Sequence, residues 1–487
     1  MVLFRFEQRP RLWFWAAMAC LAAVLMAYAQ TVAFTGDESF HVVAAKMIKA
    51  GFRPYLDFCF PQTPLNAYWN AFWIWVLPES WRTIHALASL LTSLGVVLAA
   101  DFVYRRWEPG PWRLPAAVTA GVLIGTNNIL VEFGPLGQAY GMCLFLTVAA
   151  FRATIAAVRG NTWLAGLGGA LAGAAAASSL LTAPVAPVLL VWMLWRSPAR
   201  QRWWRGAWFT CAAVVPFAPV IWLFTRQHWV VWFNLAEYHL YYREIYWPQP
   251  LTHDIGTVTA WLDDPQAMLL GLLAAIGVVW LAWLKPFDRE TRAEFYLCVW
   301  LLAGMFLELA FGHPTFARYF ITLTPFFGIL AVAGLYAIGS RALGPSRPFW
   351  PCAVLCFLSV GAAIRTVCDR DVYTWRDYEA IARKVTQVTP KGDQFFTDGL
   401  VYFLTGQRPP AGMEFDYSHK LNLPPAKLAL LHVMPDSELQ AKLQAGAFYS
   451  AATCDDDTVT DYKLEERFYH KEKVGECPVF WGPKGRK

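Results

Sequence analysis

The chain has 487 residues, of which 57% are hydrophobic and only 16% are charged, and its mean hydropathy is +0.35. Soluble domains carry about 25% charged residues, so this composition excludes a disordered chain, a coiled coil and an ordinary soluble globule, and it predicts a polytopic membrane protein. The net charge is +6; because no basic block lies in a soluble segment, nucleic acid is not expected as a partner.

Hydrophobic stretches predict about eleven transmembrane helices. The expected spans cover residues 12–33, 80–104, 114–131, 138–157, 163–180, 182–196, 206–226, 266–284, 294–311, 319–340 and 348–368. The fifth and sixth meet at the small residues Ala174–Ser179 and at Pro184, so they could form one kinked or re-entrant unit. The first span, which ends near Ala27–Ala29, also resembles a cleavable signal peptide, although its apolar stretch is long for one.

The distribution of Lys and Arg predicts the orientation of these spans. With a cytoplasmic N-terminus, the short outer segments 132–137 and 312–317 carry no basic residue, whereas every inner loop does. The inner residues are Arg5, Arg9, Arg11, Arg105, Arg106, Arg152, Arg159, Arg196, Arg200, Arg202, Arg205, Lys285, Arg289, Arg292, Arg341 and Arg347. Residues 34–79, 227–265 and the segment after about 369 are then expected on the outer face.

The C-terminal segment differs in character from the rest of the chain, with more charges and weaker periodicity. We expect a transmembrane domain over residues 1–368 and a small α/β domain on the outer face over residues 369–487. Within the latter, Thr374–Val388 reads as an amphipathic helix and Gln394–Thr397 as a short buried strand. Cys454 and Cys477 lie in this domain, where an oxidising compartment would allow a disulfide; the sequence leaves that pairing open.

The first outer loop, 34–79, contains the most informative residues. Gly36 and Asp37 make a good helix start and Gly51 a good end, which predicts a helix that lies in the membrane surface with its acidic end at the mouth of the bundle. Helical spacing puts apolar and polar residues on opposite faces: Phe40, Val43, Ala44 and Met47 on one, and Glu38, His41 and Lys49 on the other. A helix cap alone could also account for the Asp37–Glu38 pair.

These motifs resemble a known family. Asp37-Glu38 directly after the first span, the run Gly51–Asp57 (G-x-x-P-Y-x-D) and the turn Gln62–Leu65 look like the polyprenyl-phosphate-sugar-dependent glycosyltransferases of the GT-C class. Relatives include the bacterial aminoarabinose–lipid A transferases and the protein O-mannosyltransferases. Two weaker matches are His313–Tyr319 before Pro325, similar to the family's outer Arg-Tyr motif, and the tail segments Pro390–Asp393 and Tyr402–Pro409, similar to the relatives' small outer domain.

The resemblance implies an all-α polytopic membrane protein of GT-C type, with outer-face juxtamembrane helices and the C-terminal α/β domain. It implies an enzyme that moves a sugar from a polyprenyl phosphate to a hydroxyl of a lipid, glycan or protein, with inversion at the anomeric carbon. The enzyme would lie in the inner (plasma) membrane and act at its periplasmic or exoplasmic face. The implied site residues are Asp37 as general base with Glu38 as its partner, Arg318 and then Arg53 for the donor phosphate, and His41, Tyr55, Asp57, Gln62, Glu132, His313 and Tyr319 for the substrates.

The sequence also departs from the family pattern and leaves alternatives open. Glu132 is the only acidic residue in the second outer loop, slightly earlier than expected, and no Lys follows the fifth span. Arg318 could be an interfacial arginine and Arg53 a solvated one, while Tyr55, Asp57 and Gln62 could simply pin their loop. No cofactor is certain; whether Asp37, Glu38 and His41 bind a divalent metal is open, as are the sugar, the acceptor, the isoprenoid length and the oligomeric state.

Two other functions remain open, a transporter or flippase and an O-antigen ligase or polymerase, and each would need different residues. A transporter or flippase for a lipid-linked glycan should have ionisable residues near mid-membrane or two related halves. Glu308 is the one clear acid inside a span, and no half-repeat is visible in the sequence. An O-antigen ligase or polymerase would depend on Arg and His residues in a large late outer loop, not on an acidic pair after the first span.

Overall fold

The computed structural model describes residues 10–33, 36–312, 314–369, 373–416 and 421–486. The chain divides into two compact units. The first comprises Met1–Gln30, His85–Ala218 and Arg243–Arg370, and the second comprises Thr31–Ile84, Pro219–Tyr242 and Asp371–Lys487. The second unit therefore joins the first of the loops expected on the outer side, and part of the third, to the tail. The expected domain boundary at residues 368 and 369 stays a prediction.

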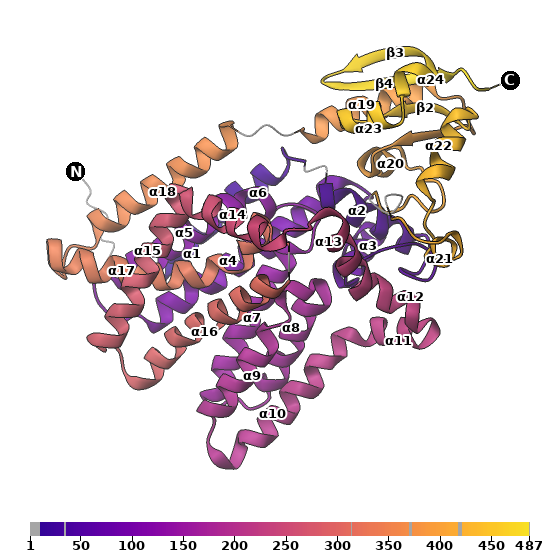
Figure 1. Cartoon of the computed structure of the whole chain (residues 1–487). Helices are drawn as coiled ribbons and strands as arrows, with labels where there is room; N and C mark the ends of the chain where they lie inside the picture. The colour runs from indigo at the N-terminus through magenta and orange to yellow at the C-terminus, as the bar shows by residue number, and fades with distance from the viewer. Residues whose placement is uncertain (1–9, 34–35, 313, 370–372, 417–420, 487) are drawn as a thin grey trace. The chain divides into compact units, whose positions relative to one another are not determined.

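The first unit consists of helices (Figure 1). They are α1 (Pro10–Ala29), most of α4 (Trp81–Arg106), α5 (Arg113–Gly125), α6 (Asn128–Phe133), α7 (Tyr140–Val158), α8 (Leu164–Ser178), α9 (Val185–Arg196), α10 (Ala199–Val214), α14 (Pro250–Asp263), α15 (Pro265–Trp283), α16 (Arg289–Phe311), α17 (Thr324–Leu343) and α18 (Phe349–Asp369). Short 3₁₀ turns are η2 (Leu180–Thr182), η3 (Val215–Phe217) and η5 (Ala317–Thr322).

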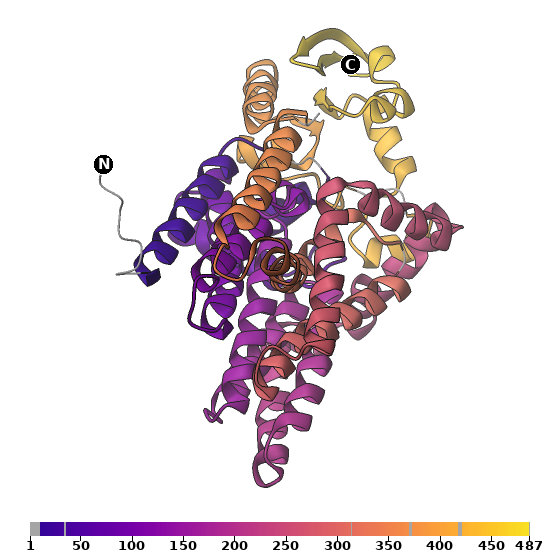
Figure 2. The same cartoon turned by 90° about the vertical axis from the view of Figure 1, so that its left-hand side faces the viewer.

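Among the described residues, eight helices are long and apolar enough to cross a membrane. They are α1, α4, α7, the continuous α10–α11 helix, α15, α16, α17 and α18. Shorter apolar helices occupy the other three expected spans, at Arg113–Gly125, Leu164–Ser178 and Leu180–Arg196. The polytopic fold class is confirmed, whereas the count of eleven spans stays a prediction. Figures 1 and 2 show α8, α9 and α10 side by side.

One expected span has an internal break, and two neighbouring spans are joined by a short turn. The third, expected over 114–131, ends at Gly125 and is followed by the separate helix α6. The fifth and sixth are distinct helices, α8 and α9, joined by the turn η2. The small residues of this region allow close packing: a Cβ atom added at Gly173 of α8 would lie 2.0 Å from the carbonyl oxygen of Ala213 on α10.

Side-chain caps fix the starts of two long helices. Asp264 precedes α15 and accepts hydrogen bonds from the backbone N–H groups of Gln266 and Ala267, and Pro265 takes the first helical position, where no N–H is needed. Asp288 does the same for α16, accepting from the N–H groups of Glu290 and Thr291 at 2.8 and 2.9 Å. Both spans therefore begin at an aspartate.

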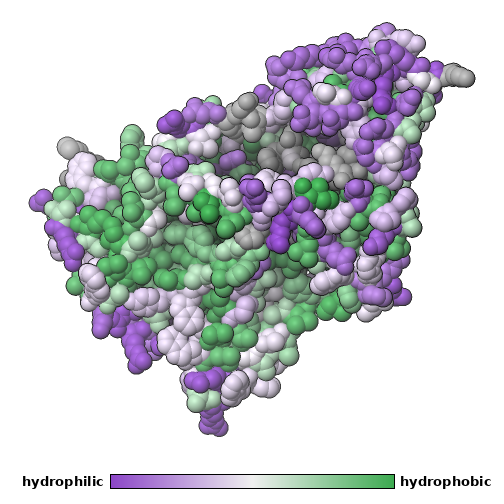
Figure 3. Space-filling view, in the orientation of Figure 1, coloured by the Kyte–Doolittle hydropathy of each residue, from purple (hydrophilic) through white to green (hydrophobic). Residues whose placement is uncertain are grey.

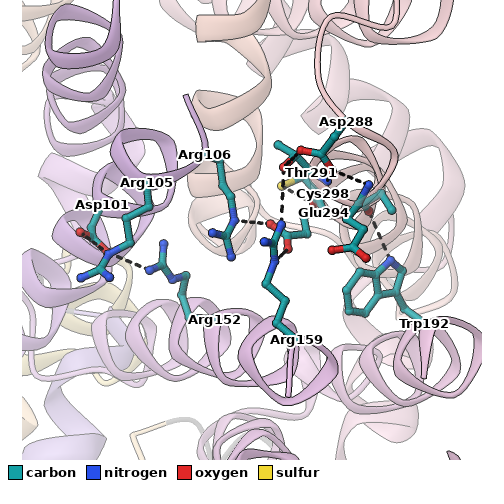
Figure 4. Close-up of polar contacts among 12 residues, drawn as sticks. Asp101, Arg105, Arg106, Arg152, Arg159, Trp192, Asp288, Thr291, Glu294 and Cys298 are labelled. Carbon is teal, nitrogen blue, oxygen red and sulfur yellow. Dashed lines mark hydrogen bonds and ion pairs between the residues drawn. The ribbon is translucent and has the colours of Figure 1, made fainter. Parts of the chain in front are cut away.

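Asp101 of α4 pairs with two of the arginines expected on the inner side (Figure 4). Its Oδ2 lies 2.7 Å from Nε of Arg105, one turn later on α4, and 2.8 Å from Nη2 of Arg152 on α7. The C-terminal halves of α4 and α7 are therefore tied to each other by charge.

Glu294 of α16 forms a second ion-pair cluster beside the first (Figure 4). It accepts from Nε of Arg106 and, at 2.5 Å, from Nε of Arg159, and only 2% of the residue is exposed. The ends of α4 and α7 and the start of α16, three helix ends that the charge pattern assigns to the inner side, thus lie together.

Hydrophobic residues gather on the surface of the long helices, whereas the face over the C-terminal sheet is hydrophilic (Figure 3). On α18, large apolar side chains point outward, and Phe357 is 77% exposed. Such a surface would be unfavourable in water and suits contact with lipid. The chain is a multi-pass membrane protein.

The second unit combines helices with a small mixed sheet (Figure 1). Its helices are α2 (Gly36–Lys49), α3 (Leu65–Val76), α11 (Ala218–Arg226), α12 (His228–Trp232), the π-helical turn η4 (Phe233–Glu237), most of α13 (Tyr238–Tyr246), α19 (Trp375–Val388), α20 (Gly399–Thr405), α21 (Pro425–Leu430), α22 (Asp436–Gln444), α23 (Asp456–Asp461) and α24 (Leu464–Arg467). Its strands are β1 (Gln394–Thr397), β2 (Phe448–Ala452), β3 (Phe468–Val474) and β4 (Cys477–Pro483).

The sheet has the strand order β1-β2-β4-β3. β1 and β2 run parallel, and the other two pairs are antiparallel. The expected helix and strand of the tail are confirmed as α19 and β1, with Thr374 and Asp377 forming a capping box at the start of α19. Cys454 and Cys477 form a disulfide that links the end of β2 to the start of β4.

Candidate functional site

The acidic pair lies in the first turn of α2, as expected, but the helix is not a surface helix with one wet face. Glu38 is completely buried and Asp37 is partly exposed. The apolar face with Phe40 packs into one hydrophobic core, while Val42 and Ala45 pack into a second core with α19 and α20. The prediction of one solvent-facing polar side is therefore wrong, because α2 packs against other residues on both sides. Its two acidic residues lie in the first turn, where the helix dipole favours negative charge.

His41 lies inside aromatic packing. Its ring stacks on Phe40 with centroids 4.8 Å apart and meets the edge of Phe60 at 5.8 Å. Burial lowers the pKa of His41 to about 3, so the imidazole is neutral at physiological pH. Within the described part of the chain its Nδ1 has no hydrogen-bond partner. A role for His41 in substrate binding stays a prediction.

The G-x-x-P-Y-x-D motif, Gly51–Asp57, forms a loop that its own hydrogen bonds close, here called the loop clasp. Arg53 and Asp57 form a bidentate ion pair, with Nε 2.9 Å from Oδ2 and Nη2 2.8 Å from Oδ1. The backbone N–H of Arg53 also donates to Oδ2 of Asp57. These bonds, first among them the side-chain bond from Arg53, lower the pKa of Asp57. Because its guanidinium already binds a carboxylate, Arg53 is a weaker candidate for the donor phosphate than its position in the sequence suggests.

Tyr55 closes the same loop from inside. Its side chain is completely buried, its hydroxyl donates to the backbone carbonyl of Gln62 at 2.6 Å, and its φ angle is +68°. A bulky residue in the left-handed region is uncommon and needs support from its surroundings. Here the buried ring and the bond to Gln62 supply that support. The side chain of Gln62 itself is partly exposed.

Arg318 belongs to the other unit, in the turn η5 before α17. Its Nε donates to the hydroxyl of Tyr140 on α7 at 3.2 Å, and its guanidinium lies 4.3 Å from the ring centroid of Phe316 and 5.5 Å from that of Tyr319. The predicted residues Arg318 and Tyr319 are therefore in contact. Stacking on aromatic faces leaves the edges of a guanidinium able to bind an oxyanion.

The segment before Arg318 is held by α14. The backbone N–H of Thr315 donates to the buried carboxylate of Asp254 at 2.6 Å, and Nε2 of His253 lies 3.0 Å from the carbonyl oxygen of Thr315. Sequence reasoning missed both α14 residues. The signal in the sequence was Asp254 itself, an acidic residue close to the apolar Leu251 and Ile255.

The remaining predicted residues are more scattered. Glu132 is exposed on α6, in the same unit as Arg318. His313 lies outside the described residues. Asp37, Glu38, His41 and the loop clasp all belong to the second unit. Among the described residues, no group of three or more His, Cys, Asp or Glu side chains could hold a metal ion.

Asn234, in the π-helical turn η4, is a further residue that the sequence did not reveal. It is completely buried, and its Oδ1 accepts from the backbone N–H of Phe60 at 2.9 Å and from Sγ of Cys59 at 3.5 Å. Nearby, His239 donates to the backbone of Pro61, and burial lowers its pKa. Residues of η4 and α13 thus fix the backbone between the clasp and α3.

Carboxylates of the tail form another unexpected group. Burial raises the pKa of Asp398 to about 7, of Glu414 to about 7 and of Asp416 to about 6. The neighbouring charge of Asp416 adds to the effect of burial on Asp398. Strongly raised pKa values of buried acids occur both at functional sites and in structural networks of charged groups.

Two crystal structures of ArnT from Cupriavidus metallidurans match this structure along nearly its whole length. The form bound to undecaprenyl phosphate matches with a TM-score of 0.65 at 15% sequence identity, and the apo form with a TM-score of 0.67 at 14%. Each match covers 97% of this chain and 99% of ArnT. The chain therefore shares the fold of ArnT. At the level of the fold, this confirms the resemblance seen in the first outer loop.

A third GT-C structure, the oligosaccharyltransferase of Archaeoglobus fulgidus tethered with an acceptor peptide, matches less well. Its TM-score is 0.48 at 13% identity, over 82% of this chain and 64% of that one. No family model matches the sequence, and no curated protein sequence matches it significantly. The likeness to GT-C proteins is thus one of three-dimensional structure and of the first-loop motifs.

Proposed function

We propose that the protein is a membrane glycosyltransferase that moves a sugar from a polyprenyl-phosphate donor to a hydroxyl of a lipid, glycan or protein. The observation that carries this proposal is the match to ArnT over both chains, transmembrane helices and tail together, because the ArnT crystal structure contains undecaprenyl phosphate. The position of an Asp-Glu pair at the start of α2, directly after the first span, supports it.

In the proposed reaction, the bond between the anomeric carbon and the phosphate oxygen breaks, and the polyprenyl phosphate leaves with the bonding electrons. The acceptor oxygen forms the new bond from the opposite side and gives its proton to Asp37. Asp37 is the better candidate for the base because it is partly exposed. Glu38 is completely buried, and we propose it as the partner of Asp37 in the same turn. A positioned general base contributes about 10²–10⁴ in rate.

Arg318 is the proposed ligand of the donor phosphate. A cation that already faces the leaving phosphate stabilises the charge that develops on it, without reorganising solvent. Tyr140, which accepts from Nε of Arg318, and the ring of Phe316 hold the guanidinium in one orientation. Arg53 is second to Arg318 because its pairing with Asp57 would have to be broken first.

We further propose that the active site faces the outer side of an inner (plasma) membrane, with the N-terminus in the cytoplasm and the tail outside. The excess of Lys and Arg in the alternate loops supports this orientation. The disulfide of the tail supports it independently, since such bonds persist in oxidising compartments.

The test uses purified protein in liposomes with a panel of polyprenyl-phosphate sugars and a membrane lipid extract as acceptor. Consumption of each donor is followed by mass spectrometry, with and without a chelator, which also decides metal dependence. We expect one donor to be consumed and Asp37→Asn to lower the rate by about 10²–10⁴. The exposed Asp456 of α23 gives a matched control, because Asp456→Asn makes the same change far along the chain and should leave the rate unchanged.

Arg318→Ala should raise the KM for the donor, and Arg318→Lys should restore part of the binding, because a lysine keeps the charge but not the planar guanidinium. A rate unaffected by Asp37→Asn would show that the base lies elsewhere. If no donor is consumed but a labelled lipid-linked glycan crosses the bilayer, the protein is a transporter and the proposal is wrong.

A further inference from the structure

The first turn of α2 is attached to the tail by a carboxylate. The hydroxyl of Ser39 donates to Oδ2 of Asp416, and the same hydroxyl lies 2.9 Å from the carbonyl oxygen of Gly36. Asp416 also accepts a hydrogen bond from the backbone N–H of Gly399, the first residue of α20. One carboxylate thus joins α2 to the N-terminus of α20, although Ser39 and Asp416 are 377 residues apart in the sequence.

The two helices meet at van der Waals distance at this point. A Cβ atom added at Gly399 would lie 2.9 Å from Cβ of Ser39 and 3.3 Å from Oδ1 of Asp416, so that no side chain fits there. Further along α2, Nζ of Lys46 donates to the backbone carbonyl of Tyr402 on α20 at 3.2 Å. α2 is therefore held by α20 at two positions two turns apart.

α20 is itself fixed within the tail. The hydroxyl of Tyr402 donates to the carbonyl of Phe395 on β1 at 2.6 Å. Asp398, which precedes α20, accepts from the hydroxyl of Thr453 at 3.2 Å and from the backbone N–H of Cys454, one of the two disulfide cysteines. The sheet and the disulfide therefore hold α20, and α20 holds α2.

We propose that Asp416 is a positioning residue for the acidic pair, fixing the rotation of the first turn of α2 through Ser39. The inference rests on the proposed function, because it gives a role to the placement of Asp37. Ser39 directly follows Glu38, and a helical turn is stiff, so fixing Ser39 fixes the direction in which the side chains of Asp37 and Glu38 leave the helix. A displacement of about 1 Å at a catalytic group can cost about 10²-fold in rate.

The chemistry of Asp416 suits this role. An ionised carboxylate makes stronger hydrogen bonds than a neutral acceptor and can accept from Ser39 and Gly399 together. The charge of Asp416 in turn raises the pKa of Asp398, which precedes α20, and the pKa of Tyr402 on α20. The Ser39 and Gly399 bonds lower the pKa of Asp416, opposing the effect of burial.

The test measures kcat and donor KM for Asp416→Ala, Ser39→Ala and the double variant. We expect kcat to fall about 10- to 100-fold with KM nearly unchanged. The double variant should be no worse than the single ones, since both break the same contact. Asp436→Asn, which weakens the bond from the Tyr462 hydroxyl elsewhere in the tail, is the control for general loosening and should leave kcat unchanged.

Hydrogen exchange of the full-length chain provides a readout that does not depend on activity. Asp416→Ala should speed exchange in the first two turns of α2 about tenfold, whereas Asp37→Asn and Asp436→Asn should not. If Asp416→Ala fails to fold, Ser39→Ala, which removes one hydroxyl, answers the same question.

Unchanged exchange in α2 together with unchanged kcat would overturn the inference. So would a kcat loss as large in Asp436→Asn as in Asp416→Ala. Activity that survives Asp37→Asn would instead refute the proposed base, and the exchange data would still decide whether Asp416 holds α2. The two failures are therefore distinguishable.

Discussion

At the scale of single residues, the loop after α2 shows how a motif can serve structure at positions that resemble a substrate site. The guanidinium of Arg53 is bound by Asp57, and the hydroxyl of Tyr55 is bound by the backbone of Gln62. The motif of this loop is visible in the sequence, but the sequence cannot show which of its polar groups bind one another. The clasp thus favours the alternative in which Tyr55 and Asp57 pin the loop that follows the acidic helix.

Glu414 leads to a prediction about pH. Its carboxylate is 7% exposed and accepts from the backbone N–H of Gly412 at 2.8 Å, and burial raises its pKa from an ordinary value of 4.5 to about 7. Between these two values the unfolded chain has lost the proton that the folded chain keeps, so stability falls as the pH rises from about 4.5 to about 7. The loss is about 3 kcal/mol.

Glu414→Gln should remove this part of the pH dependence and keep the acceptor for Gly412. The measurement is thermal unfolding of the purified protein in detergent at intervals across that pH range. Glu466→Gln on α24, where the carboxylate is exposed, makes the same charge change and should leave the slope as it is in the native protein. An identical slope in Glu414→Gln and the native protein would contradict the assignment.

At the scale of helices, small residues allow α15 and α17 to pack with their backbones in contact. A Cβ atom at Gly277 would lie 2.2 Å from the carbonyl oxygen of Leu330, and one at Gly334 would lie 1.9 Å from that of Leu273. Neither helix can move aside freely, since each also packs against other helices of the unit. Close approach of this kind is a common means of association between helices in membranes.

Gly277→Ala should therefore destabilise the protein by about 1–3 kcal/mol. Gly271 is a matched control on the same helix, because a Cβ atom there would meet nothing within 4 Å. Gly271→Ala should be neutral or stabilising by up to about 1 kcal/mol, the difference in helix propensity. Melting temperatures in detergent measure both effects, and equal shifts for the two variants would exclude the close contact.

α2 is the element where the sequence and the structure differ most. Its predicted bounds are close to the observed Gly36–Lys49, because Gly51 marks its end and the acidic residues its start. One apolar face was predicted, yet Val42 and Ala45 belong to a second buried face. The nearly continuous apolar run from 42 to 45 is typical of a helix that is covered all round. Contacts such as Ser39–Asp416 join segments too distant in the chain for any local pattern to reveal.

At the scale of the whole molecule, hydrophobicity and charge predict the positions of the helices well. Each expected span overlaps a helix, although the third is divided between α5 and α6. An apolar run in a membrane has few alternatives to a helix. The site was only partly predictable. The types of residue at Asp37 and Arg318 follow from motifs, whereas Asp254 and Asn234 act through backbone groups of distant segments and leave no motif.

The ion pairs at the predicted inner side lead to a prediction for the helical unit. Glu294 is buried between Arg106 and Arg159, so Glu294→Gln would leave two arginines without their carboxylate. We expect a loss of about 3 kcal/mol, at the lower end of values for broken buried pairs because both arginines reach solvent. Glu290→Gln, one turn earlier on α16 and exposed, should change the melting temperature little. Equal melting temperatures for the two variants would show that the cluster does not stabilise the bundle.

The enclosure of α2 has a consequence for biosynthesis. The acidic helix is among the first segments to leave the ribosome, but the residues that cover it, from α19, α20 and the loop around Phe415, are made more than 300 residues later. At usual rates of about 5–20 residues per second, this interval lasts tens of seconds. A nascent chain therefore carries Asp37 and Glu38 on a helix that can already pack against α3, but the cover from α19 and α20 is added only once the tail has been made.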